Sequence, residues 1–497
     1  MKMLCNLEVK IYGFFLFFSI FALFFYSQDS YLYDLYNRTD SAWFFMCGKA
    51  WMNGMVPYVD FADSKGPLLW LIYGLGYLIS PRDYTGVYWI TCLWYSFIYY
   101  YTYKTADIFL KNRLKSVLCA VLMTVAFFNP LFHVETRAED FCLLFVTLSL
   151  YRTCLLLYSD KVTDQMINRT FLLIGVSFSC LFLIKFNIAA IQSILLITSC
   201  YYLYRSKQSF IKPLVNYLFG VLLVLVPFLF YFIVEGNLGA FIQEYLINTT
   251  KTVSGGGLYD YLIQWVHFWS VKRLLLLLIF IILGGCLVGF KLDKYKYFPL
   301  IVSILFFVMT FRHAAWFTYY MNLCSIFLIW IVLFLLWNVA VNRNVMMLCG
   351  VLVILPLSYH LHFKTYDEQF KPFKFFSIEQ ETHFDMVNSI MCKYHQPSII
   401  NVMTYEYGYG ILSETLPGCK YWAYQNGATG EMYQNHREAV LSGYADFLYV
   451  KNRFMIAEKG ITINEIVEAG YTEVYSWGKM KESSLFIRSS LCNKNPE

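Results

Sequence analysis

The residues best suited to chemistry are the carboxylates of a polar segment that follows the first apolar run. Between residues 28 and 65 the chain carries five aspartates: Asp29, Asp34, Asp40, Asp60 and Asp63. The whole sequence is 58% hydrophobic and 20% aromatic, and acids persist in such a chain only where water or a substrate meets them. A carboxylate at a membrane surface, such as Asp40, can take a proton from a hydroxyl or an amine. We therefore expect this segment to carry catalytic chemistry.

The same segment ends in a cation. A Gly and Pro-Tyr turn at residues 54–58 precedes the last two acids, and Lys65-Gly66-Pro67 opens the next apolar run. A lysine held by a turn at the lipid boundary is suited to meet a phosphate group, since its ammonium is a compact point charge with three donors. We expect Lys65 to contact a phosphate.

A second acidic segment, 133–140, combines an arginine with three acids. Arg137 can grip a phosphate bidentately. Glu139 and Asp140 could orient the nucleophile or share a divalent cation with Asp40, and their oxygen atoms would suit magnesium or manganese. The alternative for either segment is an ordinary helix start, because acids favour the first turn of a helix.

Long apolar runs must position these residues, and a hydrocarbon core of roughly 30 Å needs about 20 residues to cross. The composition predicts a polytopic α-helical membrane protein rather than a soluble one. Apolar runs occur at 11–27, 67–79, 84–110, 115–132, 139–158, 170–184, 187–204, 213–234, 271–290, 297–311, 314–338 and 344–361.

Basic residues then assign the sides of the membrane. Short basic connections near residues 111–115, 205–212, 291–296 and 343 are expected in the cytoplasm. All runs alternate correctly if 67–79, which is too short to span, does not cross. The prediction is about eleven transmembrane helices with the amino terminus inside and loops 28–83, 133–140 and 235–270 outside. If 67–79 instead spans a thinned bilayer as a tilted helix, the two acidic loops lie on opposite sides.

Two other outer regions have distinct compositions. Loop 235–270 contains a run of three glycines at 255–257 followed by aromatic residues, which suggests an interfacial helix. Residues 362–497 alternate helix-like stretches (378–394, 430–442, 463–469) with strand-like ones (398–404, 447–451, 472–477, 484–489), which favours a small extracytoplasmic α/β domain. The domains expected are therefore 1–361, which is transmembrane, and 362–497.

Charge and cysteine content exclude other classes of function. The net charge of +6 is spread over short clusters between apolar runs, so no nucleic-acid partner is expected. Most of the 14 cysteines lie inside apolar runs without metal-type spacing and serve as small hydrophobic residues.

Together these residues resemble the membrane glycosyltransferases of the GT-C fold, in particular the bacterial branch similar to protein O-mannosyltransferases and lipid A aminoarabinose transferases. The family pattern is an Asp in the first outer loop, a Gly and Pro-Tyr stretch, Lys/His-x-Pro-Leu, and then an Arg and an acid in the second outer loop. The matching positions are Asp40, Gly54, Pro57, Tyr58, Lys65, Pro67, Leu68, Arg137 and Asp140 or Glu139.

The resemblance implies an inverting glycosyltransferase of the bacterial inner (cytoplasmic) membrane. It would transfer a sugar from a polyprenyl-phosphate donor to a glycan, lipid or protein acceptor on the outer face. The implied catalytic residues are Asp40, Glu139 and Asp140, and the implied substrate-binding residues are Lys65, Arg137, Tyr58, Asp63 and Arg312. The candidate metal, a magnesium or manganese ion, would be held by Asp40 and Asp140. Ser41 replaces the second acid of the O-mannosyltransferase pattern, which puts a protein-hydroxyl acceptor in doubt.

Three alternatives stay open from the sequence. A transporter or flippase of lipid-linked saccharides would need charges near mid-membrane, which are sparse here. A polymerase or ligase of such saccharides is expected to rely on arginines in a large late loop, whereas the largest loop here is early and acidic. A descendant without catalytic activity is the third.

Overall fold

The computed structural model describes residues 2–32, 40–129, 136–250, 269–311, 318–364, 383–404, 408–423, 430–478 and 481–492. The chain divides into two compact units. The helical unit comprises residues 1–28, 89–230 and 256–368, and the mixed unit comprises residues 29–88, 231–255 and 369–497.

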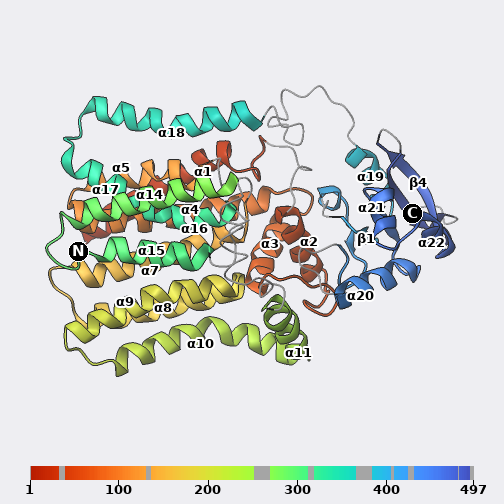
Figure 1. Cartoon of the computed structure of the whole chain (residues 1–497), viewed down its shortest axis with the longest axis horizontal. Helices are drawn as coiled ribbons and strands as arrows, with labels where there is room; N and C mark the ends of the chain where they lie inside the picture. Colours follow the sequence, from red (N-terminus) through yellow and green to blue (C-terminus); the bar gives the residue numbers. More distant parts are fainter. Residues whose placement is uncertain are drawn as a thin grey trace. The chain divides into compact units, whose positions relative to one another are not determined.

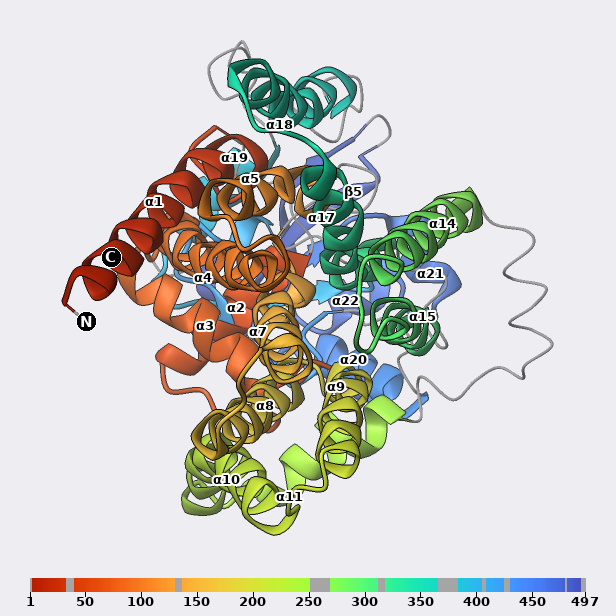
Figure 2. The ribbon, with the colours of Figure 1, turned by 90° about the vertical axis from the view of Figure 1, so that its left-hand side faces the viewer.

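The helical unit is a bundle of long helices that lie side by side in Figure 1 and are seen end-on in Figure 2. Two of its helices, α4 and α10, extend for a few residues into the mixed unit. Its elements are α1 (Lys2–Tyr26), α4 (Thr85–Leu110), α5 (Arg113–Leu122), α6 (Thr124–Phe127), α7 (Ala138–Tyr158), α8 (Asp164–Ile184), α9 (Phe186–Arg205), α10 (Ile211–Val234), α14 (Trp269–Gly289), α15 (Phe298–Phe311), η2 (Thr318–Tyr320), α16 (Met321–Ser325), η3 (Ile326–Leu328), α17 (Ile329–Asn338) and α18 (Arg343–Lys364).

Six helical stretches among the described residues are long and apolar enough to cross a membrane: Leu7–Tyr26, Ala138–Tyr158, Asp164–Ile184, Phe186–Arg205, Ile211–Val234 and Met321–Asn338. Shorter apolar helices occur at Pro67–Ile79, Leu275–Gly289, Phe298–Phe311 and Arg343–Val353. The chain is therefore a helical membrane protein. Two expected runs are interrupted, since 115–132 contains a break at Met123 and 314–338 begins in 3-10 geometry where the structure describes it.

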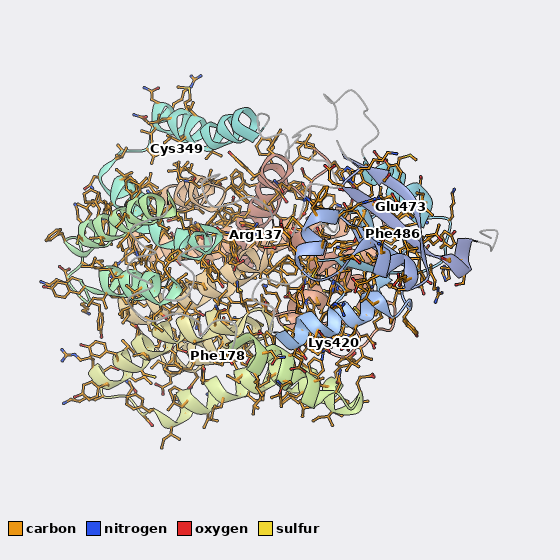
Figure 3. The ribbon with its side chains drawn as sticks, turned by 45° about the vertical axis from the view of Figure 1, so that its right-hand side comes forward. Arg137, Phe178, Cys349, Lys420, Glu473 and Phe486 are labelled. Carbon is orange, nitrogen blue, oxygen red and sulfur yellow. The ribbon has the colours of Figure 1, made fainter. Side chains whose placement is uncertain are left out.

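Helices α8 and α10 approach closely through two glycines. A β-carbon built on Gly175 of α8 would lie 2.1 Å from the carbonyl oxygen of Tyr217 on α10. A β-carbon on Gly220 of α10 would lie 2.2 Å from the carbonyl oxygen of Leu172 on α8. Small residues at such crossings let helix backbones pack together where no hydrophobic effect drives their association. Figure 3 marks α8 by its labelled residue Phe178 and α18 by Cys349.

The mixed unit joins loop segments to a sheet. Its elements are α2 (Asp40–Met52), α3 (Pro67–Ile79), α11 (Leu238–Phe241), the π-helix η1 (Ile242–Asn248), α19 (His383–Met391), β1 (Ser398–Val402), η4 (Gly408–Gly410), β2 (Leu416–Pro417), α20 (Gly430–Leu441), β3 (Phe447–Val450), α21 (Arg453–Glu458), α22 (Ile463–Glu468), β4 (Tyr471–Trp477), β5 (Ser483–Arg488) and α23 (Ser489–Cys492). The helices and strands expected in the tail are confirmed in type and approximate position.

The five strands form one sheet in the order β2-β1-β3-β5-β4. Strand β1 runs parallel to β2 and β3, while β5 is antiparallel to β3 and β4. Successive residues of β3 enter different core clusters, with Phe447 in one and Leu448 in the other, as the two-residue period of a strand requires. Glu473 on β4 stands opposite Phe486 on β5, and both are labelled in Figure 3.

Helices α2 and α3 pack on each other within the mixed unit. A β-carbon on Gly48 would lie 2.4 Å from the backbone nitrogen of Gly74, so the two backbones are in direct contact. The thirteen residues of α3 reach about 20 Å at about 1.5 Å per residue, which is shorter than the hydrocarbon core. Leu69, Trp70 and Tyr73 of α3 are fully buried.

A buried lysine ties α2 to the tail. The ammonium of Lys49 donates to the carbonyl oxygens of Gly410 at 2.6 Å and Ser413 at 3.0 Å. Burial lowers the pKa of Lys49 to about 7. Trp43 of α2 stacks on Trp422 with ring centroids 4.7 Å apart. The first acidic loop and the tail, which sequence analysis assigned to different domains, therefore share one compact unit.

The segment 231–250 is held to the same part of the tail. Glu244 of η1 is buried and accepts hydrogen bonds from the hydroxyl of Tyr421 at 2.9 and 3.0 Å. Lys420 Nζ lies 2.6 Å from the same carboxylate, and the Lys420 carbonyl accepts from the backbone of Ala62. Burial, followed by the charge of Glu244, raises the pKa of Tyr421, so its hydroxyl stays protonated and donates. Three segments distant in sequence thus meet at Lys420 and Tyr421.

Candidate functional site

The candidate residues fall into two sets, one in each unit. Asp40, the candidate base, is the first residue of α2 and is partly exposed. Acids are favoured in this position because the amino end of a helix carries partial positive charge. The placement agrees with either reading of Asp40, as a base or as a helix start.

In the turn between α2 and α3, Tyr58 holds the backbone of Lys65 in place. Tyr58 has a positive φ of 68°, an uncommon conformation for a residue with a side chain, and its ring is fully buried. Its hydroxyl donates to the carbonyl oxygen of Lys65 at 3.0 Å. The ring packs against Trp70 and Phe241 with centroid distances of 4.7 and 5.4 Å. Tyr58 therefore fixes the backbone of Lys65 instead of facing solvent.

Asp63 and Lys65 form a close pair at the end of this turn. Lys65 Nζ lies 3.8 Å from Oδ2 of Asp63, and the side chains are 21% and 9% exposed respectively. The other carboxylate oxygen of Asp63 accepts from the backbone of Ser64 at 2.6 Å. The Lys65 ammonium also donates to the Ser64 hydroxyl at 3.1 Å. Asp63 thus orients a lysine that retains access to solvent.

In the helical unit, Asp140 organises the start of α7. Its Oδ2 accepts from the backbone N–H of Arg137, the residue before α7, at 2.9 Å. Its Oδ1 accepts from the hydroxyl of Tyr95 at 2.5 Å and from the side-chain amide of Asn322 at 2.9 Å. The residue is buried, with 3% of its surface exposed. Three donors, on α4, on the residue before α7 and on α16, therefore converge on one carboxylate.

The neighbouring acid, Glu139, forms a buried ion pair. Its Oε1 lies 2.6 Å from Nζ of Lys185, the residue between α8 and α9. The side chains of Glu139 and Lys185 are 3% and 11% exposed. The Lys185 ammonium also lies 4.0 Å from the ring centroid of Tyr320, within the range of a cation–π contact.

Arg137 completes this cluster from the residue before α7. Its guanidinium lies 4.3 Å from the ring centroid of Tyr319, on η2. A guanidinium can stack on an aromatic ring, and its geometry matches that of a phosphate. Tyr320 in turn receives a hydrogen bond from the side-chain amide of Asn187 at 3.3 Å. The side chains of Arg137, Lys185, Tyr319 and Tyr320 thus form one cationic and aromatic cluster, and Figure 3 labels its Arg137.

Sequence reasoning missed several residues around Arg137, Glu139 and Asp140. Lys185 stands between two apolar runs, and such an isolated charge in a membrane helix pair is itself a sign of function. Tyr95 and Asn322 gave no signal, because a single polar residue inside an apolar run does not reveal its partner. Arg312, a predicted phosphate contact, lies outside the described residues, as does the interfacial helix expected from the aromatic residues after the three glycines.

The surroundings of the Asp140 carboxylate do not suit a metal ion. Both of its oxygens accept from protein donors, and the amide of Asn322 presents hydrogen toward Oδ1. Over the ranges that the structure describes, no group of three or more histidine, cysteine or acidic residues is placed to hold a metal. The sharing of a metal ion by Asp40 and Asp140 stays a prediction from the sequence.

Comparison with known proteins gives one informative result. No family model matches the sequence, and no curated protein matches it. Among solved structures, ArnT from Cupriavidus metallidurans bound to undecaprenyl phosphate aligns with a TM-score of 0.57 and 9% sequence identity, covering 98% of both chains. The apo state of the same protein aligns over 99% of both chains with a TM-score of 0.46 and 9% identity.

The likeness to the first of these structures extends over nearly the whole chain, and at 9% identity it concerns the fold alone. It confirms the resemblance inferred from the order of the motifs. This chain is a helical membrane protein with the fold of ArnT, an aminoarabinose transferase of the GT-C fold.

Proposed function

We propose that this protein transfers a sugar from a polyprenyl-phosphate donor to an acceptor on the outer face of a bacterial inner membrane. The observation that carries the proposal is the fold shared over 98% of both chains with a protein solved with undecaprenyl phosphate bound. A lipid-linked donor also suits the setting, because an activated nucleotide sugar is not expected outside the cytoplasmic membrane. A polyprenyl tail would find apolar surface along the long helices.

The topology belongs to the same proposal. Eleven spans with the amino terminus inside would place the first acidic loop, the start of α7 and the tail on the outer face. The basic connections support this arrangement through the positive-inside rule. The length of α3, about 20 Å, supports its assignment as a helix that does not cross.

Asp40 is the base in this proposal. Its carboxylate takes the proton of an acceptor hydroxyl or amine while the acceptor oxygen or nitrogen bonds to the anomeric carbon of the sugar. The bond from that carbon to the phosphate oxygen breaks, and its electron pair leaves with the polyprenyl phosphate. Attack on the face opposite the leaving group inverts the anomeric configuration.

Each unit offers its own candidates for binding the donor phosphate. In the mixed unit, Lys65 is the candidate, since Asp63 orients it and its ammonium retains solvent access. In the helical unit, Arg137 offers a planar guanidinium for bidentate binding, and Lys185 lies against the same tyrosine pair. A cation bound to the phosphate would stabilise the negative charge that develops on it as it leaves.

The other candidates act by positioning in this scheme. Tyr58 holds the carbonyl of Lys65, and its burial argues against contact with substrate. Asp140 holds the backbone of Arg137, and its three hydrogen bonds fit an orienting residue better than a base. Glu139 compensates the charge of Lys185.

Binding of undecaprenyl phosphate tests the proposal before the sugar is known. The purified full-length protein in nanodiscs should bind undecaprenyl phosphate, as measured by native mass spectrometry. Lys65→Ala should weaken this binding about tenfold, as expected for the loss of a charge-assisted contact of roughly 1.5 kcal/mol. Glu235→Gln, at the exposed position after α10, is the control and should bind like the wild type. Equal binding by Lys65→Ala would contradict the assigned role.

A further inference from the structure

Arg152 is a buried cation in a membrane helix that the proposed transfer does not use. It lies on α7, thirteen residues from Glu139, which is about 20 Å along the helix. Only 7% of its surface is exposed. Charged residues inside membrane helices are costly and usually mark a functional site. The buried charge of Arg152 therefore indicates a second functional site, at the end of α7 remote from Glu139.

Among the described residues, no acid forms an ion pair with Arg152. Its Nη2 donates to the carbonyl oxygen of Met166 at 3.2 Å, while Nε is buried without a hydrogen-bond partner among the described residues. The nearby charged group is a second cation, Arg169 of α8, which is exposed. Neither arginine forms an ion pair within the part of the chain that the structure describes. On α1, Glu8 pairs with Lys104 of α4 instead, at 3.2 Å.

Two tyrosines complete the surroundings of the arginines. The rings of Tyr101 on α4 and Tyr151 on α7 stack with centroids 5.8 Å apart. The guanidinium of Arg152 lies 5.8 Å from the ring centroid of Tyr151. Tyr101 interacts electrostatically with Tyr151 and with both arginines. Helices α4, α7 and α8 thus bring two positive charges and two phenol hydroxyls together.

We propose that Arg152, Arg169, Tyr101 and Tyr151 bind the phosphate of an anionic phospholipid headgroup. Guanidinium groups match phosphate geometry, and tyrosine hydroxyls can donate to its remaining oxygens. Arg152 lies six residues, or about 9 Å, from the end of α7, a depth that favours a lipid over a soluble phosphate. Basic pockets between membrane helices bind such headgroups.

Lipid binding to the detergent-purified full chain tests this site. Native mass spectrometry would measure the apparent affinity for phosphatidylglycerol and for phosphatidylcholine. Thermal-shift titrations with sodium phosphate and with phosphatidylglycerol would compare the soluble source with the lipid. The variants are Arg152→Gln and Arg169→Gln, with Lys212→Gln, an exposed cation that starts α10, as the matched control.

The wild type should prefer phosphatidylglycerol, and each arginine variant should bind it about fivefold more weakly, as expected for one basic residue near an anionic lipid. The Lys212→Gln variant should match the wild type. Unchanged affinity in the arginine variants, or equal binding of phosphatidylcholine, overturns the proposal. Stabilisation by sodium phosphate equal to that by lipid overturns the lipid assignment. If Arg152→Gln does not fold, Arg169→Gln, at an exposed position, provides the test.

Discussion

Lys185 Nζ lies 2.6 Å from Oε1 of Glu139, although the two residues are 46 positions apart in the sequence. The pair joins the first turn of α7 to the junction between α8 and α9. Because both charges are withdrawn from water, each depends on the other for compensation. The pair therefore fixes Lys185 beside Tyr319, the tyrosine that Arg137 also contacts.

Breaking this pair should destabilise the protein. Lys185→Met leaves the Glu139 carboxylate buried without compensation, which should cost about 3–5 kcal/mol of stability. The double variant Lys185→Met with Glu139→Gln removes both charges and should recover most of the stability. Thermal unfolding in detergent measures the stability, and native mass spectrometry measures binding of undecaprenyl phosphate.

The double variant separates structure from function. If Lys185 binds the donor phosphate, the double variant should be stable and yet bind undecaprenyl phosphate several-fold more weakly. Wild-type binding by the stable double variant would limit the pair to a structural role.

The crossing of α8 and α10 should not tolerate a methyl group. Gly175→Ala places a β-carbon 2.1 Å from the Tyr217 carbonyl oxygen, so the helices must separate, at a cost of about 1–3 kcal/mol. Gly13→Ala on α1 is the control, because nothing lies within 4 Å of its β-carbon position. The melting temperature should fall for Gly175→Ala alone; an equal melting temperature for both variants would mean that the helices do not cross so closely.

Stability should depend on pH through Lys49. Burial lowers the pKa of this lysine to about 7, whereas the unfolded chain has the ordinary value of about 10.4. Between these values the unfolded chain binds more protons, so the free energy of unfolding should rise with pH, by up to about 1.4 kcal/mol per unit. Below pH 7 this contribution is constant, because the lysine is protonated in both states.

The comparison of Lys49→Met with the wild type isolates this effect. Melting temperatures measured from pH 6 to 9 should rise more steeply in the wild type than in Lys49→Met. Lys393→Met, at an exposed position, should keep the wild-type slope. Parallel curves for the wild type and Lys49→Met would show that Lys49 does not titrate in this range.

Labelling of single cysteines tests the topology. In a cysteine-depleted background, an impermeant maleimide should label cysteines at Arg82, Glu235 and Tyr444 from outside. Cysteines at Asn112 and Lys207 should label only after permeabilisation. All five positions are exposed. Labelling at Arg82 only after permeabilisation would instead mean that α3 crosses the bilayer.

Sequence patterns anticipated the fold where local periodicity decides it. The half-length run 67–79 appears as α3 with the same bounds, and the tail strands follow their alternating apolar residues. The pattern did not show that the acidic loop and the tail form one unit. That association depends on Lys49 reaching the carbonyl oxygens of Gly410 and Ser413, some 360 residues away, and no local signal records such a contact.

The candidate site, too, could be predicted from the sequence only in part. The order of motifs selected Arg137 and Lys65, and the structure provides both with oriented surroundings. The sequence could not separate the roles of Glu139 and Asp140, because adjacent residues on a helix point in different directions. One faces Lys185, and the other faces Tyr95 and Asn322.

Turnover by an Asp40 variant tests the central claim most directly. Purified protein in nanodiscs would be given lipid-linked sugars extracted from its own membranes, and release of free polyprenyl phosphate would be measured by mass spectrometry. The wild type should release polyprenyl phosphate in step with acceptor modification. Asp40→Asn should fold, bind undecaprenyl phosphate and release at least about 100-fold less, as for loss of a general base. Wild-type release by Asp40→Asn would contradict the mechanism.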